Sequence, residues 1–307
     1  MTSATARIGA GPAVRRPRRR RRLVAWLFIA PLAIVNLLVI GGPGLSSLLF
    51  SFTDWDGLGQ ANFVGIDNYV ELFQSPNVLA AIWHNLLWTL FFLIVPISMA
   101  LLGAFLLSRL RRGQVLFRTL YFIPYVLATI VSATIWRQIL SPDAGIGAAL
   151  ANLGFDGLAG VNFLGDPSLA LGSVAFVNNW QWWGFLLVLF LAAMQGVNPA
   201  LYEAARLDGA NAWREFWHIT LPGIRPTLMF LVLMTVIWSF LVFDYVYILT
   251  QGGPAGSSDV LATVLYRTAF SEQRAGYASA MAMLLSSISA VVVAGYLILR
   301  KKLDWDV

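Results

Sequence analysis

The chain has 307 residues, of which 58% are hydrophobic and 12% are charged. The charged share is about half that of a typical soluble domain, so the chain cannot build an ordinary water-exposed surface and lipid must cover much of it. Cysteine is absent, which excludes disulfide frameworks, thiolate nucleophiles and cysteine-based zinc sites.

Six apolar segments have about the 20 residues that a helix needs to cross ~30 Å of hydrocarbon. They are 23–40, which ends at Gly41-Gly42-Pro43, then 85–108, 119–136, one crossing within 167–202, 226–243 with an extension towards Thr250, and 275–299. Pro31, Pro96 and Pro124 fall inside these segments, where neighbouring helices and hydroxyl side chains can satisfy the freed backbone groups. We therefore predict an all-α membrane protein with six transmembrane helices.

The basic residues indicate the orientation. Six crossings put both termini on one side, and if that side is the cytoplasm, the inner segments hold 18 of the 21 Lys and Arg residues. The outer side then holds only Arg137, Arg267 and Arg274, beside a first loop with four acidic residues and no basic one. The positive-inside rule thus predicts that both termini are cytoplasmic.

The arginine run 15–22, followed by an apolar stretch, is also typical of a secretory signal peptide. No cleavage site of the Ala-x-Ala kind follows Ile40, so we favour an uncleaved first helix. Binding of nucleic acid by the same arginines is disfavoured because topology explains them and no aromatic residues interleave them.

The two histidines, His84 and His218, lie far apart in the sequence. An isolated histidine is more often a hydrogen-bonded structural residue than a ligand, so we assign neither one any chemistry and expect no metal site. No arrangement of a nucleophile with acid and base residues is visible either. We do not expect an enzyme.

The loop 198–222 between the fourth and fifth spans predicts two short helices. Asn198 is a good N-cap, and Pro199 suits the first helical position, where its missing N–H costs nothing. Gly209 can end the first helix in a left-handed conformation. The second helix would end near Pro222 and place four apolar residues on one stripe: Trp213, Phe216, Trp217 and Leu221. Such a stripe alone would also suit a helix lying on lipid headgroups.

The same loop closely resembles the EAA motif of the permease subunits of ABC importers. The motif requires Glu-Ala-Ala, three residues, Gly, nine residues and Ile-x-Leu-Pro, and this chain fills every fixed position. The matching residues are Glu203, Ala204, Ala205, Gly209, Ile219, Leu221 and Pro222, with Asp208 of the common form. The resemblance implies that the loop is a coupling helix that docks in a cleft of a cytoplasmic ATPase, a helix-in-groove contact.

The chain cannot hydrolyse ATP itself. A P-loop needs a lysine after its glycines, and the only lysines are Lys301 and Lys302. We therefore expect no cofactor on this chain, with ATP and Mg used by a separate ATPase subunit.

From Leu23 to Lys302 the chain resembles carbohydrate permeases of the maltose-permease type. The stretches that carry this resemblance are 63–73, 121–125, 136–137, 142–145 and 243–254. It implies the type I ABC importer permease fold, with a basic cytoplasmic tail at 1–22, a first transmembrane helix at 23–50, an external loop at 51–80, the importer domain at 81–300 and a cytoplasmic tail at 301–307. The implied partners are a second, different permease subunit, two ABC ATPase subunits and an extracytoplasmic sugar-binding protein, in the cytoplasmic membrane of a prokaryote.

A sugar site should pair aromatic platforms with neutral hydrogen-bonding groups. The resemblance places this site on Gln181, Trp182, Phe185, Thr235, Trp238 and Ser239, with Val242 and Phe243 beside them. Trp182 stands where the maltose permease has a glycine and Val242 where it has an amide, which disfavours maltose itself. Ordinary packing is the alternative explanation for these residues.

Asp244 is the only acidic residue in this apolar stretch and joins the candidate substrate-binding residues. An ionised carboxylate at mid-bilayer costs roughly 2.5 to 3.5 kcal/mol on insertion scales, so it should face a cavity, pair with a cation or lie near the outer interface. Its place near the end of the span favours the interface.

The sequence therefore predicts a permease subunit that imports a sugar, an oligosaccharide, by ATP-driven alternating access. An importer of glycerol 3-phosphate or a related small solute is the first alternative, although an anion would prefer a cation near the midplane and the spans contain no Arg or Lys. A carrier that uses no ATP is a remote alternative, because it needs ionisable residues deep in the bundle.

Overall fold

The computed structural model describes residues 18–110 and 112–302. The predicted N-terminal tail lies outside this part up to residue 17, and the predicted C-terminal tail from residue 303. Regular structure in the described residues is helical, apart from one antiparallel β-bridge between Thr53 and Phe63. The all-α prediction is confirmed.

The chain divides into two compact units after Ser46, and each is described by itself. In chain order, the first helices are α1 (Arg18–Asn36), η1 (Leu37–Gly41), α2 (Gly42–Phe50), α3 (Asp67–Gln74), α4 (Pro76–Ser108), α5 (Gln114–Val126), α6 (Thr129–Ile139), α7 (Ile146–Ala151) and η2 (Asp156–Leu158). They are followed by α8 (Ala170–Gln195), α9 (Pro199–Leu207), α10 (Ala212–Glu215), η3 (Phe216–Thr220), α11 (Leu221–Gly223), α12 (Arg225–Phe240), α13 (Asp244–Leu249), α14 (Leu261–Phe270) and α15 (Ala275–Lys302).

The first predicted span does not end at Gly41-Gly42-Pro43. The helix continues to Phe50 through the π-helical segment η1, in which the Gly42 N–H donates to the Leu37 carbonyl. The wider turn lets the helix accommodate Pro43, which has no N–H to give. The apolar part Trp26–Phe50 has 25 residues, enough to cross a bilayer.

In the second unit, α4, α8 and α15 are also long and apolar enough to span a membrane. Two further candidates are bent: α5 with α6, by 95°, and Ala212–Gly223 with α12, by 74°. The described residues therefore hold four such helices, or six if each bent pair is one span. The second span is longer than predicted, because α4 already begins at Pro76, where a proline suits the first helical turn.

The third and fifth spans are both interrupted, which was predicted for neither. α5 ends just after Pro124, and both Leu127 and Ala128 adopt extended backbone conformations before α6 begins. The fifth stops at Phe240 and resumes at Asp244 as the short helix α13. Such breaks free backbone groups that must find partners within the protein.

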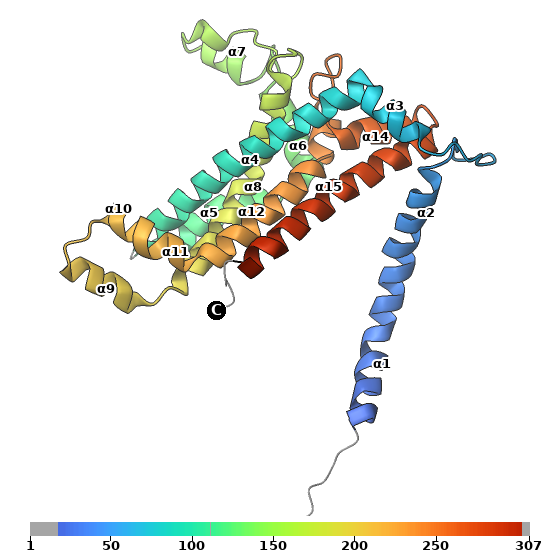
Figure 1. Cartoon of the computed structure of the whole chain (residues 1–307). Coiled ribbons are helices and arrows are strands. Elements are labelled where there is room, and N and C mark those ends of the chain that lie inside the picture. The colour runs from blue at the N-terminus through green and yellow to red at the C-terminus, as the bar shows by residue number, and fades with distance from the viewer. Residues whose placement is uncertain (1–17, 111, 303–307) are drawn as a thin grey trace, which may run out of the picture. The chain divides into compact units, whose positions relative to one another are not determined.

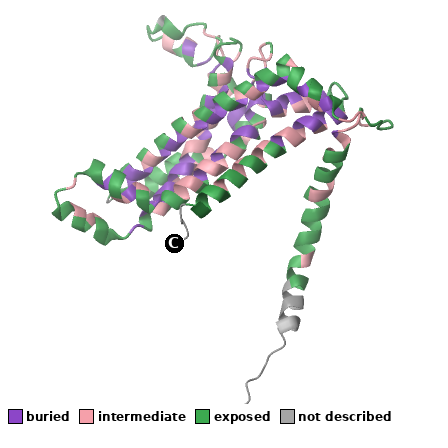
Figure 2. Cartoon of the chain, viewed as in Figure 1, coloured by how far each residue is buried: buried purple, intermediate pink, exposed green. Residues whose placement is uncertain are grey.

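Close helix packing forms the centre of the bundle. α4 packs most extensively against α8, which also packs on α5, and buried positions concentrate on these inner faces (Figure 2). Gly103 allows this approach in α4, since a Cβ there would lie 2.6 Å from Leu187 Cδ1 of α8. Gly184 does the same for α5, since its Cβ would lie 1.9 Å from the Tyr121 carbonyl oxygen. Small residues at crossings are what membrane helices use to bring backbones together.

The bundle has two ends that carry different charges. α9 to α11 and the end of α15 lie at one end, and α3, α7 and α14 lie at the other (Figure 1). At the second end the Arg274 guanidinium donates to both oxygens of Glu71, at 2.7 and 2.6 Å, and this hydrogen bonding holds the pKa of Glu71 below its ordinary value. Segments that the charge distribution assigns to one side of the membrane thus contact each other.

A change at Gly184 tests the packing of α5 on α8. We expect Gly184→Ala to lower the free energy of unfolding by about 1 to 3 kcal/mol, because the added methyl group collides with backbone rather than a movable side chain. The measurement is thermal unfolding in detergent. The matched control is Gly172→Ala in the same helix, where nothing lies within 4 Å of the added Cβ, and equal stability of the two variants would contradict this packing.

Candidate functional site

A cavity of about 400 Å³ lies between α4, α5, α8 and α12. Both interrupted spans open onto it, since Leu127, Ala128 and residues 241–243 belong to its wall. Its lining residues are Trp88, Phe92, Tyr125, Leu127, Ala128, Thr129, Asn178, Gln181, Trp182, Thr235, Trp238, Ser239, Leu241, Val242, Phe243, Asp244 and Tyr245. Non-helical backbone at membrane depth is tolerated where it lines a cavity, and such breaks mark the binding sites of many transporters.

Most of the predicted substrate-binding residues meet at this cavity. Those that line it are Gln181, Trp182, Thr235, Trp238, Ser239 and Asp244, together with Val242 and Phe243. Phe185 is not part of the lining, but its ring stacks on Tyr125 with centroids 4.5 Å apart. The fourth and fifth spans therefore bring the predicted set together, with Phe185 behind the wall.

Aromatic rings form one side of the cavity. Trp182 and Trp238 make an edge contact with centroids 4.3 Å apart, and Phe185 lies 5.2 Å from Trp182. Such a wall can cover the apolar face of a ring-shaped ligand.

Two polar groups at the cavity lack hydrogen-bond partners among the described residues. They are the Trp182 Nε1–H and the Thr235 hydroxyl, and Thr235 is 1% exposed. A buried polar group without a partner costs about 1 to 3 kcal/mol. Both residues line the cavity, but these two polar atoms have almost no exposed surface, so a ligand with hydroxyl groups would reach them only after neighbouring side chains move.

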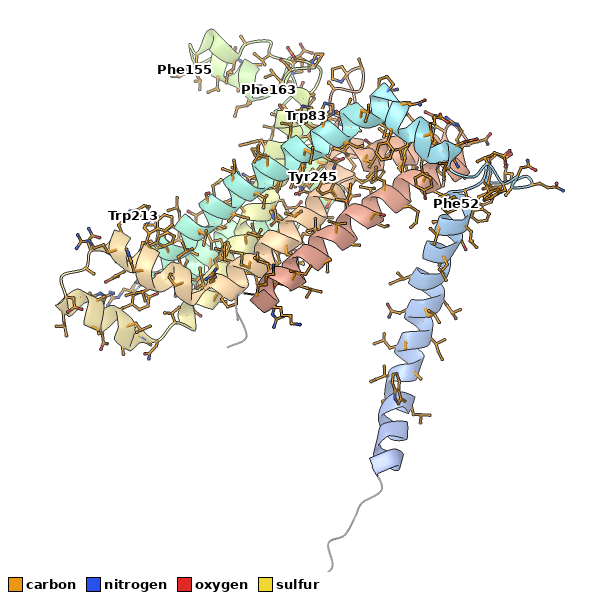
Figure 3. All side chains as sticks on the ribbon, viewed as in Figure 1. Phe52, Trp83, Phe155, Phe163, Trp213 and Tyr245 are labelled. Atoms are coloured by element: carbon orange, nitrogen blue, oxygen red, sulfur yellow. The ribbon has the colours of Figure 1, made fainter. Side chains whose placement is uncertain are left out.

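Gln181 connects the two interrupted spans. Its Nε2–H donates to the carbonyl of Leu127 at 2.6 Å, and its Oε1 accepts a hydrogen bond from the hydroxyl of Tyr245. Tyr245 lies inside the bundle (Figure 3). The amide of Gln181, predicted to bind substrate, is thus engaged by the protein, a link that the sequence could not reveal because it depends on the break at Leu127.

Asp244 is the first residue of α13 and lines the cavity. Of the three arrangements expected for this carboxylate, the structure shows the one that faces a cavity. No salt bridge to Asp244 occurs within residues 18–110 and 112–302.

The loop 198–222 has the predicted two helices around a turn. The Asn198 side chain accepts a hydrogen bond from the Ala200 N–H at 3.0 Å, and Pro199 is the first helical residue. Gly209 has φ +77°; its N–H donates to Arg206 and the next N–H donates to the carbonyl of Ala205. These two bonds form a Schellman motif, in which glycine takes the left-handed position.

Three residues of the predicted apolar stripe contact one another: the ring centroid of Trp213 lies 5.8 Å from that of Phe216 and 5.6 Å from that of Trp217, and those of Phe216 and Trp217 are 5.5 Å apart. Phe216 is buried and packs on Phe105 of α4, with ring centroids 4.9 Å apart. Trp213 and Trp217 are exposed, at 58% and 47%, and Trp213 lies at the α10 end of the bundle (Figure 3). The stripe therefore packs on α4 through Phe216 and leaves the other two rings on the outside of the bundle.

The motif residues of this loop divide by exposure. The exposed ones are Glu203, Ala204, Asp208, Gly209 and Pro222, and the half-buried ones are Ala205, Ile219 and Leu221. Ile219 packs against the core cluster between α4 and α8. Part of the motif therefore forms an outward surface, and part anchors the loop to the bundle.

A buried carboxylate in this loop escaped the sequence analysis. Glu215 accepts hydrogen bonds from Arg109 and, at 2.9 Å, from Arg206, and donation to this carboxylate raises the pKa of Arg206. The only signal in the sequence was a charge among apolar residues. Its partner Arg109 lies too far away in the chain for any local pattern to indicate the pair.

Both histidines lie at hydrogen-bond distance from a backbone carbonyl. The Nδ1 atom of His84 lies 2.8 Å from the Asp259 carbonyl oxygen, and that of His218 lies 3.1 Å from the Arg214 carbonyl oxygen. Within the part of the chain that the structure describes, no group of three His, Asp or Glu residues could hold a metal ion.

A bundle of membrane-spanning helices around a cavity lined by broken spans is the arrangement of a membrane transport protein. Comparison with protein families identifies which kind: residues 93–305 match the family described as the binding-protein-dependent transport system inner membrane component. The chain belongs to this family.

Individual relatives agree. The chain is 36% identical over 274 residues to the probable ABC transporter permease protein YurN of Bacillus subtilis, covering 88% of this chain and 93% of the relative. It is 34% identical over 313 residues to the diacetylchitobiose uptake system permease protein NgcF of Streptomyces coelicolor, covering 95% and 88%.

The fold also matches a solved bacterial ABC transporter involved in the import of the acidic polysaccharide alginate. The TM-score is 0.81 at 26% identity, over 92% of this chain and 96% of the matched chain. The protein is thus a permease subunit of an ABC importer, a multi-pass component of the cytoplasmic membrane and a transport subunit rather than an enzyme.

Replacement of Gln181 tests the link between the interrupted spans. We expect Gln181→Leu to destabilise the protein by about 1 to 3 kcal/mol, because the buried Tyr245 hydroxyl loses its partner and the Leu127 carbonyl at the cavity wall loses its hydrogen bond. Tyr245→Phe removes one hydrogen bond without leaving its own hydroxyl unpaired and should cost less. Unfolding in detergent compares them, and a smaller effect of Gln181→Leu than of Tyr245→Phe would contradict the link.

Proposed function

We propose that this chain carries a neutral oligosaccharide through the cavity between α4, α5, α8 and α12. The observation that carries the proposal is the pairing of an aromatic wall at Trp182 and Trp238 with the unpartnered Thr235 hydroxyl. Sugars present hydroxyls around an apolar ring face, and such a site matches both features. The relatives whose names state a substrate include a permease for diacetylchitobiose.

The charge of the cavity favours a neutral ligand. Its wall includes Asp244 and contains no Lys, Arg or His. A phosphate or a carboxylate would be desolvated there without a cation to stabilise it, at high cost. Glycerol 3-phosphate, the alternative substrate, fits this wall less well than an uncharged sugar.

The loop 198–222 is proposed as the contact with the ATPase. Its exposed residues Glu203, Ala204, Asp208 and Gly209 offer a carboxylate pair and a close-approach surface around the turn, and the second helix anchors the loop to α4 through Phe216. The ATPase would supply the nucleotide site with its Mg. Its affinity for nucleotide in the two states must differ for ATP to drive alternating access.

The complete transporter would contain this chain, a different permease subunit, two ATPase subunits and an extracytoplasmic sugar-binding protein, in the membrane of a prokaryotic cell. Hetero-pairing of the permeases follows from the likeness to carbohydrate permeases. With 18 of 21 basic residues on one side, the end of the bundle that carries α9 to α11 faces the cytoplasm.

Gly209→Asp tests the docking loop. We expect uptake to be lost while the protein stays in the membrane, because a non-glycine residue resists the left-handed backbone and the new carboxylate lies on the docking surface. ATPase co-purification and sugar uptake are the measurements. The control is Gly154→Asp, which also replaces an open glycine with positive φ, +88°, in the segment after α7; normal uptake by Gly209→Asp would refute the docking assignment.

The substrate is tested with reconstituted transporter and a panel of cellobiose, chitobiose, maltotriose and glycerol 3-phosphate. We expect uptake of a neutral sugar and, in Trp238→Ala, an apparent affinity about three- to tenfold weaker, the value of a lost aromatic platform. Trp83→Ala is the control, because Trp83 is 58% exposed and does not line the cavity. Uptake of glycerol 3-phosphate alone would refute the proposal.

A further inference from the structure

Glu215 joins three segments at the end of the bundle that carries α9 to α11. It belongs to α10; Arg206, which donates to its Oε1 at 2.9 Å, belongs to α9, and Arg109, which donates to its Oε2, directly follows α4. α9 is the helix whose exposed face forms the proposed docking surface. The carboxylate therefore connects that helix to the end of a transmembrane helix.

The burial of the three side chains is unequal. The Glu215 side chain is 2% exposed, whereas those of Arg109 and Arg206 are 35% and 60% exposed. A buried carboxylate is stable only when its partners stay in place, and hydrogen bonds between ionised groups are the strong, directional kind. Each arginine thus donates to the buried carboxylate through one nitrogen, while its side chain as a whole remains partly exposed.

Two further contacts lie close to the Glu215 ion pairs. The hydroxyls of Tyr202 in α9 and Thr220 are 3.0 Å apart, and the Arg109 guanidinium lies 4.5 Å from the centroid of the Phe105 ring. Phe105 in turn packs on Phe216. The loop is therefore fixed to α4 by an ionic link on one side and by an aromatic contact on the other.

The helix that receives this link also reaches the cavity. α4 contributes Trp88 and Phe92 to the cavity wall, and it continues without interruption to Ser108. A displacement of α9 that moves Arg109 would therefore act on one continuous helix that lines the cavity.

We infer that Glu215 is a positioning residue that couples the docking loop to α4, through Arg206 and Arg109, so that movement of α9 by the ATPase reaches the cavity. This role rests on the proposed docking of residues 198–222. Glu215 lies outside the fixed positions of the EAA motif. Its proposed role is to transmit movement, not to contact the ATPase.

The choice of variant follows from the burial. Glu215→Gln removes the charge without leaving a buried ion, since both arginines can turn to water, and so should remain folded. Replacing both arginines would instead leave a buried carboxylate unpaired and would destabilise the chain. Glu215→Asp keeps the charge on a shorter side chain and serves as the conservative variant.

The first measurement is a distance in the complex purified with its ATPase subunits. The native chain has no cysteine, so spin labels can be attached through Leu207→Cys on α9 and Leu106→Cys on α4, which are 89% and 65% exposed. With the native Glu215, the distance between the labels should have a narrow distribution that is the same without nucleotide and with ATP, Mg and vanadate. In Glu215→Gln the distribution should broaden and shift with nucleotide.

The second measurement compares uptake of the sugar panel with ATP hydrolysis in proteoliposomes. We expect Glu215→Gln to reduce uptake per ATP hydrolysed about tenfold, with partial recovery in Glu215→Asp and with unchanged amounts of bound ATPase. Arg118→Gln is the control, because Arg118 is exposed on α5 near the same end and forms no salt bridge among the described residues.

The two proposals fail differently. The docking of residues 198–222 on the ATPase is refuted if the native complex retains no ATPase. It is also refuted if the native and Gly209→Asp complexes retain equal amounts of ATPase. An unchanged narrow distance and normal uptake per ATP in Glu215→Gln, with ATPase bound, overturn the role of Glu215 while leaving the docking intact.

Discussion

The structure depends on one constraint: every backbone group at membrane depth must find a partner within the protein, because lipid offers none. The carbonyl of Leu127, freed where the third span breaks, meets this constraint through the side chain of Gln181. The same amide receives the hydroxyl of Tyr245, in the helix that follows the break of the fifth span. Gln181 of the uninterrupted α8 thus stabilises the breaks in both the third and the fifth span. The cavity lies where these two spans are interrupted.

Ion pairs connect segments at the two ends of the bundle, whereas the hydrogen bonds of Gln181 connect segments in its middle. At one end, Arg274 at the start of α15 holds Glu71 of α3. At the other, Arg109 and Arg206 hold Glu215. Ion pairs between exposed groups contribute little, so the pair at Glu71 mainly sets geometry, whereas the buried Glu215 requires its partners for stability.

The sequence predicted those features that depend on local chemistry or on membrane length. Asn198 and Gly209 could be assigned as a cap and a helix stop because each role requires few other residues. The gathering of Trp182, Thr235 and Trp238 at one cavity was expected from family resemblance, and no pattern of hydropathy alone would have selected them among the apolar residues of α8 and α12.

What the sequence missed depends on contacts between distant segments. The break at Leu127 follows a proline, but Pro31 and Pro96 lie within helices that continue, so proline alone does not decide. What differs is the tertiary partner, Gln181, on another helix. The stripe of Trp213, Phe216 and Trp217 is similar: its spacing is local, but which ring packs on Phe105 of α4 depends on a contact between distant segments.

α4 explains how one fold can serve both the cavity and the loop. Its 33 residues extend ~50 Å at 1.5 Å per residue. Near its beginning, Asn85 donates to the Ser239 carbonyl and accepts from the Leu261 N–H; further on, Trp88 borders the cavity, and the helix ends beside Arg109. The helix continues through Pro96 without a break, and packed protein interiors deform little and transmit strain, so a displacement at Arg109 would tilt the helix about Asn85. Such a tilt displaces each residue in proportion to its distance from Asn85, so Phe92, about two turns away, moves relative to α12 more than Trp88 does.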